Sequence, residues 1–245
     1  MNARELEESL PFLTNIEADR KEEFEQYFRT APLWISGFFS TEVLPKKTIL
    51  IHEGAPVDTV YFIAAGIIKA TEYRVYNIAY DYMFFNRVYA FGGMEIVMNL
   101  DKYRTTLQTV TECTVLKIPA PVFRQWLDTD MHAFKHESRL IGEYLLEQAR
   151  CSRALLFLQG ANRVAFLLAN RYRNYAKNGV LRLRGNRQEL SDFTGLCVKT
   201  INRSIKKFRE NGLISVDGRY LLIDHEQYVR LEKIVSEILA DDAEV

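Results

Sequence analysis

Residues 186–211, NRQELSDFTGLCVKTINRSIKKFREN, decide the fold of the C-terminal part of this chain. The pattern predicts two short helices joined at residues 194–197. Asn186 and Glu189 are spaced as a capping box, which marks the start of the first helix. The apolar residues of the second helix recur at helical spacing: Ile201, Ile205 and Phe208. The second helix therefore has one apolar face and one largely polar, basic face. A helix-turn-helix needs this division, because its second helix packs on the domain with one face and enters the major groove of DNA with the other.

The charge of the chain is divided unevenly along its length. The 245 residues carry no net charge, yet residues 160–220 contain 13 Lys or Arg and four Asp or Glu, whereas residues 1–159 contain 17 and 21. A basic segment attached to an acidic remainder is typical of a DNA-binding module joined to a domain with another role. Solvation of one protein face is the alternative explanation of these charges.

The cysteines and the N-terminal residues indicate where the protein works. Cys113, Cys151 and Cys197 lie far apart in the sequence, so neither a disulfide framework nor a metal-ligand spacing is predicted. The first residues contain no apolar run of the kind found in a secretory signal, and no stretch is long and apolar enough to span a membrane. We therefore expect a cytoplasmic protein that contacts no membrane.

The N-terminal half predicts a short amphipathic helix followed by a β domain. Residues 16–28 have helical spacing and end before Pro32. Short β-branched and aromatic runs then follow, which indicate an antiparallel barrel or sandwich. The predicted strands are residues 48–51, 60–63, 67–70, 80–85, 107–110 and 114–118. Glycines 54, 66, 92 and 93 fall between these runs, where tight turns need positive φ.

A long helix is predicted at residues 131–158. One seam of this helix has a 4-3-4-3 spacing suited to pairing with a second copy: Ile141, Leu145, Gln148, Ser152 and Leu155. The alternative is a core helix that packs on its own β domain, although a helix of this length spans about 40 Å, more than one small barrel covers.

A winged helix closes the chain. A helix at residues 162–176 and a strand at 180–183 precede the two helices of the opening stretch. Strands at 213–216 and 220–223 then pair across Asp217-Gly218, and a final helix covers 227–239. The predicted class is α+β: an antiparallel double-stranded β-helix, or jelly-roll, barrel (residues 1–129), a dimerisation helix (130–159) and a winged helix-turn-helix (160–245).

The order of these parts resembles the Crp/Fnr family of bacterial transcription regulators over nearly the whole chain. The barrel motif is similar at Glu53-Gly54 and at residues 60–66, VYFIAAG, and the hinge motif at residues 157–165, FLQGANRVA. The helix-turn-helix match is the most specific, at RQEL (187–190), Thr194-Gly195, KTINRSI (199–205) and GLI (212–214). The resemblance implies a DNA-binding homodimer that responds to a signal.

Several residues are expected to contact DNA. The resemblance assigns base reading to Arg203, whose planar fork can donate two bonds to guanine. Val198 and Lys199 differ from the pairs of many relatives, so the target sequence should differ as well; Asn202 completes the expected base-reading set. The expected phosphate contacts are Arg187, Gln188, Thr200 and Lys206. Cys197 stands where the helix dipole lowers a thiol pKa, so a redox role is an alternative to its use as a small capping residue.

The effector site departs from the cyclic-nucleotide members of the family. Those members use a Gly-Glu pair and an Arg-Ser pair, whereas this chain has Phe91-Gly92-Gly93-Met94 and Tyr103-Arg104-Thr105-Thr106. A shift of one residue would restore Arg104 as a phosphate ligand. The predicted effector pocket contains Gly92, Gly93, Met94, Arg104, Thr105, Tyr82, Phe84, Tyr144 and Gln148. We expect an unknown small effector other than cAMP, such as an apolar or aromatic molecule.

Other cofactors of the family fit less well. No cysteine precedes Cys113, so no iron-sulfur cluster is expected. His52, His132 and His136 are the candidate axial ligands of a haem, but exposed histidines are the simpler interpretation, and no metal site is predicted.

These observations favour a homodimeric, sequence-specific DNA-binding regulator that is not an enzyme. Its expected partners are palindromic double-stranded DNA and a second copy of the chain, with RNA polymerase as a further candidate. A cyclic-nucleotide-responsive regulator is one alternative. A small-molecule-binding module whose helix-turn-helix does not bind DNA is another.

Overall fold

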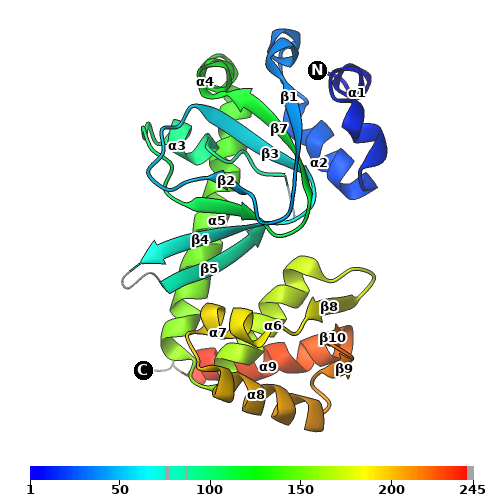
Figure 1. The fold of residues 1–245 in the computed structure, drawn as a ribbon, viewed down its shortest axis with the longest axis vertical. Coiled ribbons are helices and arrows are strands. Elements are labelled where there is room, and N and C mark those ends of the chain that lie inside the picture. The colour runs from blue at the N-terminus through cyan, green and yellow to red at the C-terminus, as the bar shows by residue number, and fades with distance from the viewer. Residues whose placement is uncertain (75–77, 86–87, 242–245) are drawn as a thin grey trace. The chain divides into compact units, whose positions relative to one another are not determined.

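The computed structural model describes the backbone of residues 1–74, 78–85 and 88–241, and the side chains of residues 1–70 and 88–236. The chain forms two compact units, Met1–Leu145 and Leu146–Val245, and the long helix α5 (Met131–Phe157) contributes residues to both (Figure 1). The α+β class is confirmed, and each unit has a hydrophobic core of its own.

Four short helices open the N-terminal unit: α1 (Ala3–Ser9), η1 (Pro11–Asn15), α2 (Ala18–Phe28) and η2 (Leu33–Phe38). Only α2 was predicted, and it begins two residues after the predicted start. Its apolar face is buried in the core of the unit, where Phe28 stacks on Trp126 with ring centroids 5.6 Å apart. Each such buried side chain contributes roughly 1.5–3 kcal/mol to folding.

Within the described residues of this unit, seven strands form two antiparallel sheets. One sheet has the order β1-β7-β3, formed by Ser40–Leu44, Cys113–Pro119 and Thr59–Ala65. The other has the order β2-β6-β4-β5, formed by Ile49–Ile51, Thr106–Thr109, Ile68–Arg74 and Ile78–Phe85. All six predicted strands are present. The described pairings make two separate sheets and do not close into one ring. The additional strand, β1, is an edge strand that is exposed along most of its length.

Glycine is required where the backbone turns sharply between strands. Gly66 has a φ of 91°, and a Cβ atom there would lie 2.3 Å from the carbonyl oxygen of Glu112. Gly54 and Gly92 also have positive φ, as predicted. Gly93 is different: it is the first residue of the short helix α3 (Gly93–Val97). The helix α4 (Ala120–Thr129) follows β7, packs on η2 and leads to α5.

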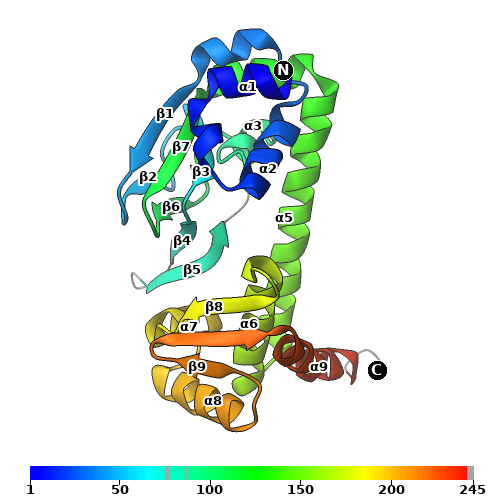
Figure 2. The same ribbon diagram turned by 90° about the vertical axis from the view of Figure 1, so that its right-hand side faces the viewer.

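The C-terminal unit contains a winged helix (Figure 2). After α5 come α6 (Ala161–Tyr175), β8 (Val180–Arg184), α7 (Arg187–Thr194), α8 (Val198–Glu210), β9 (Ser215–Asp217), β10 (Tyr220–Asp224) and α9 (His225–Asp241). The three strands form an antiparallel sheet in the order β8-β10-β9, and Gly218, with a φ of 54°, lies in the predicted turn. The strand β9 begins later than predicted because Leu213 and Ile214 are buried in the core before it starts.

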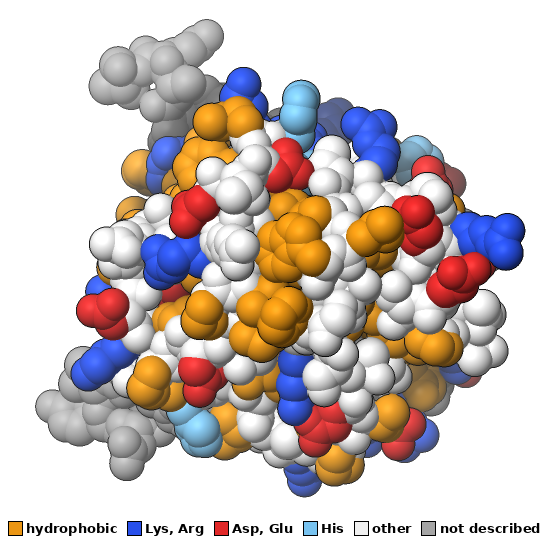
Figure 3. Space-filling model, turned by 90° about the horizontal axis from the view of Figure 1, so that it is seen from above, with side chains coloured by type: hydrophobic (Ala, Val, Ile, Leu, Met, Phe, Trp, Pro, Cys, Tyr) orange, Lys and Arg blue, Asp and Glu red, His pale blue; other side chains and the backbone are white. Residues whose placement is uncertain are grey.

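The surface of the N-terminal unit is mixed in character. Figure 3 looks onto the end of the molecule that carries α1 and α4, and it shows hydrophobic side chains gathered between charged residues of both signs. Four large apolar side chains of η2 and β1 are exposed: Leu33, Trp34, Phe38 and Val43. Within the described residues, no helix is long and apolar enough to cross a membrane.

Candidate DNA-binding helix and effector pocket

Local hydrogen bonds set the angle between α7 and α8. The Asn186 side chain accepts the backbone N–H of Gln188 at 3.2 Å, two residues away rather than at the predicted Glu189. Gly195 ends α7 with a left-handed φ of 67°, and its N–H donates to the Ser191 carbonyl. The Ser191 hydroxyl donates in turn to the Leu196 carbonyl at 2.5 Å. The turn is therefore held by its own backbone and side-chain bonds.

The two faces of α8 divide as the sequence predicted. The buried face carries Ile201, Ser204, Ile205 and Phe208. The exposed residues include Lys199, Asn202, Arg203 and Lys206. Burial of the apolar residues fixes the rotation of the helix about its axis. The basic side chains are consequently held in solvent.

The four predicted base-reading residues differ in their exposure to solvent and in whether their side chains have hydrogen-bond partners within the chain. Arg203 is exposed, and its guanidinium has no hydrogen-bond or ion-pair partner among the described residues. Lys199 is exposed and Val198 is half-buried. The Asn202 carboxamide oxygen accepts a bond from Arg187 Nε at 3.0 Å. To contact a DNA base, the Asn202 side chain must therefore break its hydrogen bond with Arg187 or keep this bond while its amide group donates to the base.

The predicted phosphate contacts also have partners within the chain. Gln188 donates to Asp192 at 2.7 Å, and Lys206 lies 3.8 Å from Glu210 one turn along α8. An exposed pair of this kind is worth less than about 1 kcal/mol, so Lys206 can leave it easily. Thr200 is half-buried beside Cys197.

The wing, defined as the β9–β10 hairpin, and the neighbouring strand β8 bring two further basic residues that sequence reasoning missed, Arg219 and Arg182. The Arg219 carbonyl accepts the N–H of Gly185, just before α7, and Arg187 donates to the Gly185 carbonyl at 3.2 Å. Arg182 lies over the Tyr220 ring at 4.2 Å. The sequence offered one indication of this: Arg219 directly follows Gly218 in the predicted turn between the two strands of the wing. The wing turn is therefore tied to the start of the helix-turn-helix.

Cys197 is the N-cap residue of α8 and is exposed. Its Sγ lies 3.3 Å from the Thr200 hydroxyl, and this hydrogen bond lowers the pKa of the thiol. The predicted dipole effect has the same direction.

A separate cavity of about 80 Å³ lies in the N-terminal unit. Four of the predicted effector residues line it: Gly92, Met94, Thr105 and Tyr144. Tyr89 and Phe91 also line it, two aromatic residues of the kind expected around an apolar or aromatic effector. The wall residues that were not predicted are Ile51, Ala90, Glu95, Tyr103, Leu107, Glu137, Leu140 and Ile141. Gly93, Arg104 and Gln148 are not on this wall, and the side chains of Tyr82 and Phe84 lie outside the described residues.

Glu137 on α5 is the least expected residue of the pocket. It is 3% exposed and accepts a hydrogen bond from the Tyr27 hydroxyl at 2.5 Å. Burial raises the pKa of its carboxyl group to about 7, although the bond from Tyr27 opposes the shift. A Cβ atom on Gly93 would lie 2.3 Å from Glu137 Oε1. Glycine at 93 therefore leaves the space that this carboxyl group occupies.

A second buried carboxylate controls the loop before β6. Glu95 Oε1 accepts the backbone N–H of Arg104 at 3.1 Å, while the Arg104 side chain is exposed. The Tyr103 hydroxyl donates to the Thr59 carbonyl, and burial raises the pKa of this tyrosine. Among the described lining residues there are two carboxyl groups and no Lys or Arg. The pocket is consequently poor in groups that attract an anion.

The candidate haem ligands lie away from this wall. His52 and His132 are exposed. His136 is half-buried and meets the Tyr27 ring edge-on at 5.3 Å. The described lining residues include no histidine, so none of the three candidate histidines belongs to the pocket wall.

The proposed dimer seam of α5 is divided between the two units. Ile141 lines the pocket, and Leu155 packs against the core of the C-terminal unit. Leu145 and Ser152 are exposed, while Gln148 is half-buried. Two further leucines of α5 that were not predicted are strongly exposed, Leu146 at 72% and Leu156 at 76%.

Two family models match consecutive parts of the chain. The cyclic nucleotide-binding domain matches residues 41–130, and the Crp-like helix-turn-helix domain matches residues 149–231. The second match includes the α7–α8 pair and the wing. The chain belongs to the Crp/Fnr family.

Curated relatives and solved structures agree with this assignment. The chain is 22% identical over 197 residues to the cAMP-activated global transcriptional regulator CRP of Salmonella typhimurium, covering 78% of this chain and 92% of that protein. It is 24% identical over 185 residues to the regulatory protein HlyX of Actinobacillus pleuropneumoniae, covering 73% and 75%. FixK2 from Bradyrhizobium japonicum has the same fold, with a TM-score of 0.69, 16% identity and coverage of 79% and 96%.

This member of the Crp/Fnr family is a DNA-binding transcription regulator with a domain of the cyclic-nucleotide-binding type. Its relatives are transcription regulators rather than enzymes. The domain type points to a small-molecule effector.

Proposed function

We propose that the protein is a homodimeric, sequence-specific regulator whose DNA affinity is set by a small effector other than a cyclic nucleotide, bound in the N-terminal unit. The observation that carries the proposal is the exposed face of α8. Arg203 is held in solvent there by the burial of Ile201, Ser204 and Ile205, with no competing partner among the described residues. A guanidinium presented in this way can donate two bonds to a guanine.

The chemistry of the pocket supports an effector other than cAMP. A cyclic nucleotide brings a phosphate, but the described wall carries Glu95 and Glu137 and no basic side chain. The arginine that could bind phosphate, Arg104, is exposed and contributes its backbone N–H to Glu95. The cavity of about 80 Å³ is also small beside typical ligand pockets of roughly 300–1,000 Å³. A small, uncharged or cationic molecule fits this wall better.

The exposed leucines of α5 support self-association. Leu145, Leu146 and Leu156 expose large apolar side chains on one helix, and burying each of them is favourable by roughly 1.5–3 kcal/mol. A dimer with two-fold symmetry would recognise a palindromic operator whose half-sites are about one helical turn apart.

The DNA-binding role is tested by selecting the preferred sequence from random duplexes and measuring affinity for it with Arg203→Ala. We expect a loss of about 1–3 kcal/mol on the selected site, with little change on random DNA, because base readout is lost while phosphate contacts remain. Arg139→Ala, an exposed arginine of the N-terminal unit, is the matched control. Unchanged affinity in the Arg203 variant would favour a helix-turn-helix that does not read DNA.

The effector is tested separately by calorimetric titration with cAMP and cGMP. We expect no saturable binding to the N-terminal unit. Binding that is abolished by Arg104→Ala would instead establish the cyclic-nucleotide-responsive alternative, with the backbone rearranged to bring Arg104 to the phosphate.

A further inference from the structure

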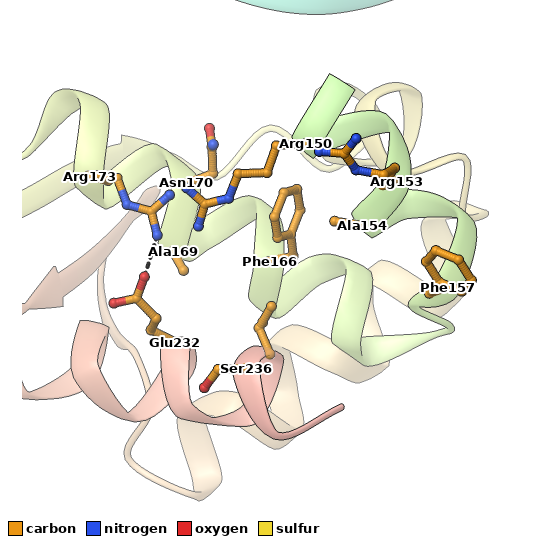
Figure 4. A pocket seen from close by; sticks show the side chains of 11 residues that line it. Arg150, Arg153, Ala154, Phe157, Phe166, Ala169, Asn170, Arg173, Glu232 and Ser236 are labelled. Atoms are coloured by element: carbon orange, nitrogen blue, oxygen red, sulfur yellow. Dashed lines mark hydrogen bonds and ion pairs between the residues drawn. The ribbon is translucent and has the colours of Figure 1, made fainter. Parts of the chain in front are cut away.

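A second cavity, of about 380 Å³, lies entirely within the C-terminal unit (Figure 4). Its walls come from the end of α5, from α6 and from α9. The lining residues are Arg150, Arg153, Ala154, Phe157, Phe166, Ala169, Asn170, Arg173, Glu232, Val235 and Ser236. This volume falls in the range of small-molecule sites, roughly 300–1,000 Å³. The cavity is made of helices that do not include α7 or α8.

One wall of the cavity lies beyond the segment that the Crp-like helix-turn-helix model matches. The match to the Crp-like helix-turn-helix domain ends at residue 231, and Glu232, Val235 and Ser236 of α9 follow it. The helix α9 packs along α6, with Leu231 and Val235 buried in the core of the unit. Three residues of the cavity wall therefore follow the matched segment.

Among the described lining residues, the arginines outnumber the carboxylates. Arg173 forms an ion pair with Glu232, which neutralises that side of the cavity. Arg150 lies 4.0 Å from Glu147, at the limit of an ion pair, and the Glu147 carboxylate already accepts a bond from Asn170 at 2.9 Å. Arg153 has no ion-pair partner among the described residues. The cavity thus keeps an excess of positive charge from two guanidinium groups on α5.

The floor of the cavity is apolar and aromatic. Phe166 points into the space between the arginines in Figure 4, and Arg150 extends from α5 toward Asn170 and Arg173. Ala154, Ala169 and Val235 complete an apolar surface that is otherwise buried. Guanidinium groups bind carboxylate and phosphate in a bidentate manner and also stack on flat rings. The wall therefore suits a molecule with an anionic group and a flat apolar part.

We infer that this cavity is a binding site for a small organic anion, in which a carboxylate or phosphate group is attached to an apolar ring. The anionic group meets Arg150 and Arg153, and the ring lies against Phe166. Such a ligand joins the last turns of α5 to α6 and α9. The site is separate from the pocket of the N-terminal unit, and it does not depend on the proposed function.

Phenyl phosphate is a suitable probe, measured by isothermal titration on the full-length protein. We expect saturable binding that is about tenfold or more tighter than that of inorganic phosphate, with no comparable binding of phenol. Arg150→Gln and Arg153→Gln should each weaken it about tenfold, because each removes a charge-assisted hydrogen bond. Both residues are exposed, so neither substitution removes a core contact.

Arg139→Gln is the matched control, since Arg139 is also an exposed arginine of α5 with one weak pair, at 3.4 Å from Glu143. It should leave phenyl phosphate binding unchanged. Ser236→Trp, at an exposed position of the wall, should fill the cavity and abolish binding while DNA affinity without the probe is retained. Two results would overturn the inference: no saturable binding of phenyl phosphate, or equal binding by the wild type and the Arg150→Gln/Arg153→Gln double variant.

Discussion

Replacing Glu137 by Gln should change how the stability of the N-terminal unit depends on pH. The buried carboxyl group has a pKa of about 7 in the folded chain, against an ordinary value of 4.5. Below pH 4.5 the group is protonated in both the folded and the unfolded chain, so its burial does not lower the free energy of unfolding through ionisation. Between pH 4.5 and 7 the unfolded chain loses the proton first, and the free energy of unfolding falls as pH rises. Above pH 7 the decrease in the free energy of unfolding, relative to its value below pH 4.5, is constant at about 3 kcal/mol at most.

Glutamine keeps an oxygen that can accept the Tyr27 hydroxyl but has no proton to lose. The stability of Glu137→Gln minus that of the wild type should therefore rise by up to about 3 kcal/mol between pH 4.5 and 7, and then level off. Urea unfolding at pH 5, 6, 7 and 8 measures this difference. Tryptophan fluorescence follows the correct unit, because both tryptophans of the chain, Trp34 and Trp126, lie in it.

Glu143→Gln is the matched control, since Glu143 is an exposed residue of the same helix that pairs with Arg139. Its stability difference from the wild type should show no comparable rise. If the Glu137→Gln and wild-type profiles run parallel from pH 5 to 8, the carboxyl group is not held neutral by burial and the reasoning is wrong.

Two further predictions concern single residues. Gly93→Ala should destabilise the N-terminal unit by about 1–3 kcal/mol in the same urea assay, because the new methyl group overlaps the Glu137 carboxyl group; an equal cost in a Glu137→Ala background would contradict this origin. With a thiol-reactive dye at pH 7, Cys197 should react before Cys113 and Cys151, because it is exposed with a lowered thiol pKa while burial raises the pKa of the other two. The fastest phase of dye labelling should be lost in Cys197→Ser. Persistence of this phase in the variant would refute its assignment to Cys197.

Sequence periodicity predicted the elements whose side chains alternate between core and solvent. The strands β3 and β7 and the helix α8 were found for this reason, since each carries a clear apolar pattern. The strand β1 was missed because only Leu44 is buried in it, and α3 was missed because five residues are too few for a helical period. Boundaries shifted where burial continued beyond the strand, as at Leu213 and Ile214.

The residues of the candidate sites also divide into those that local sequence patterns could locate and those that only the fold reveals. The exposed basic face of residues 198–206 could be predicted because the face of a helix follows from local spacing alone, whereas the role of Arg203 on that face came from the family resemblance. Glu137 follows the same spacing as Ile141 and Tyr144 on α5, so a helical projection could have placed it on the pocket side. Its burial could not be deduced, since this depends on Tyr27, 110 residues away, and on the space left at Gly93.

The amino-acid sequence by itself determined the strand pattern of the N-terminal part and the helix-turn-helix, because capping, turn glycines and apolar spacing act within a few residues. Only the tertiary structure decided the chemistry of the two cavities. Glu95 and Glu137 both line one cavity, and Arg150 and Arg153 line the other together with residues of α6 and α9. The walls of each cavity come from segments that are distant in the sequence, and the pKa of a carboxyl group depends on which neighbours and how much water the fold leaves around it.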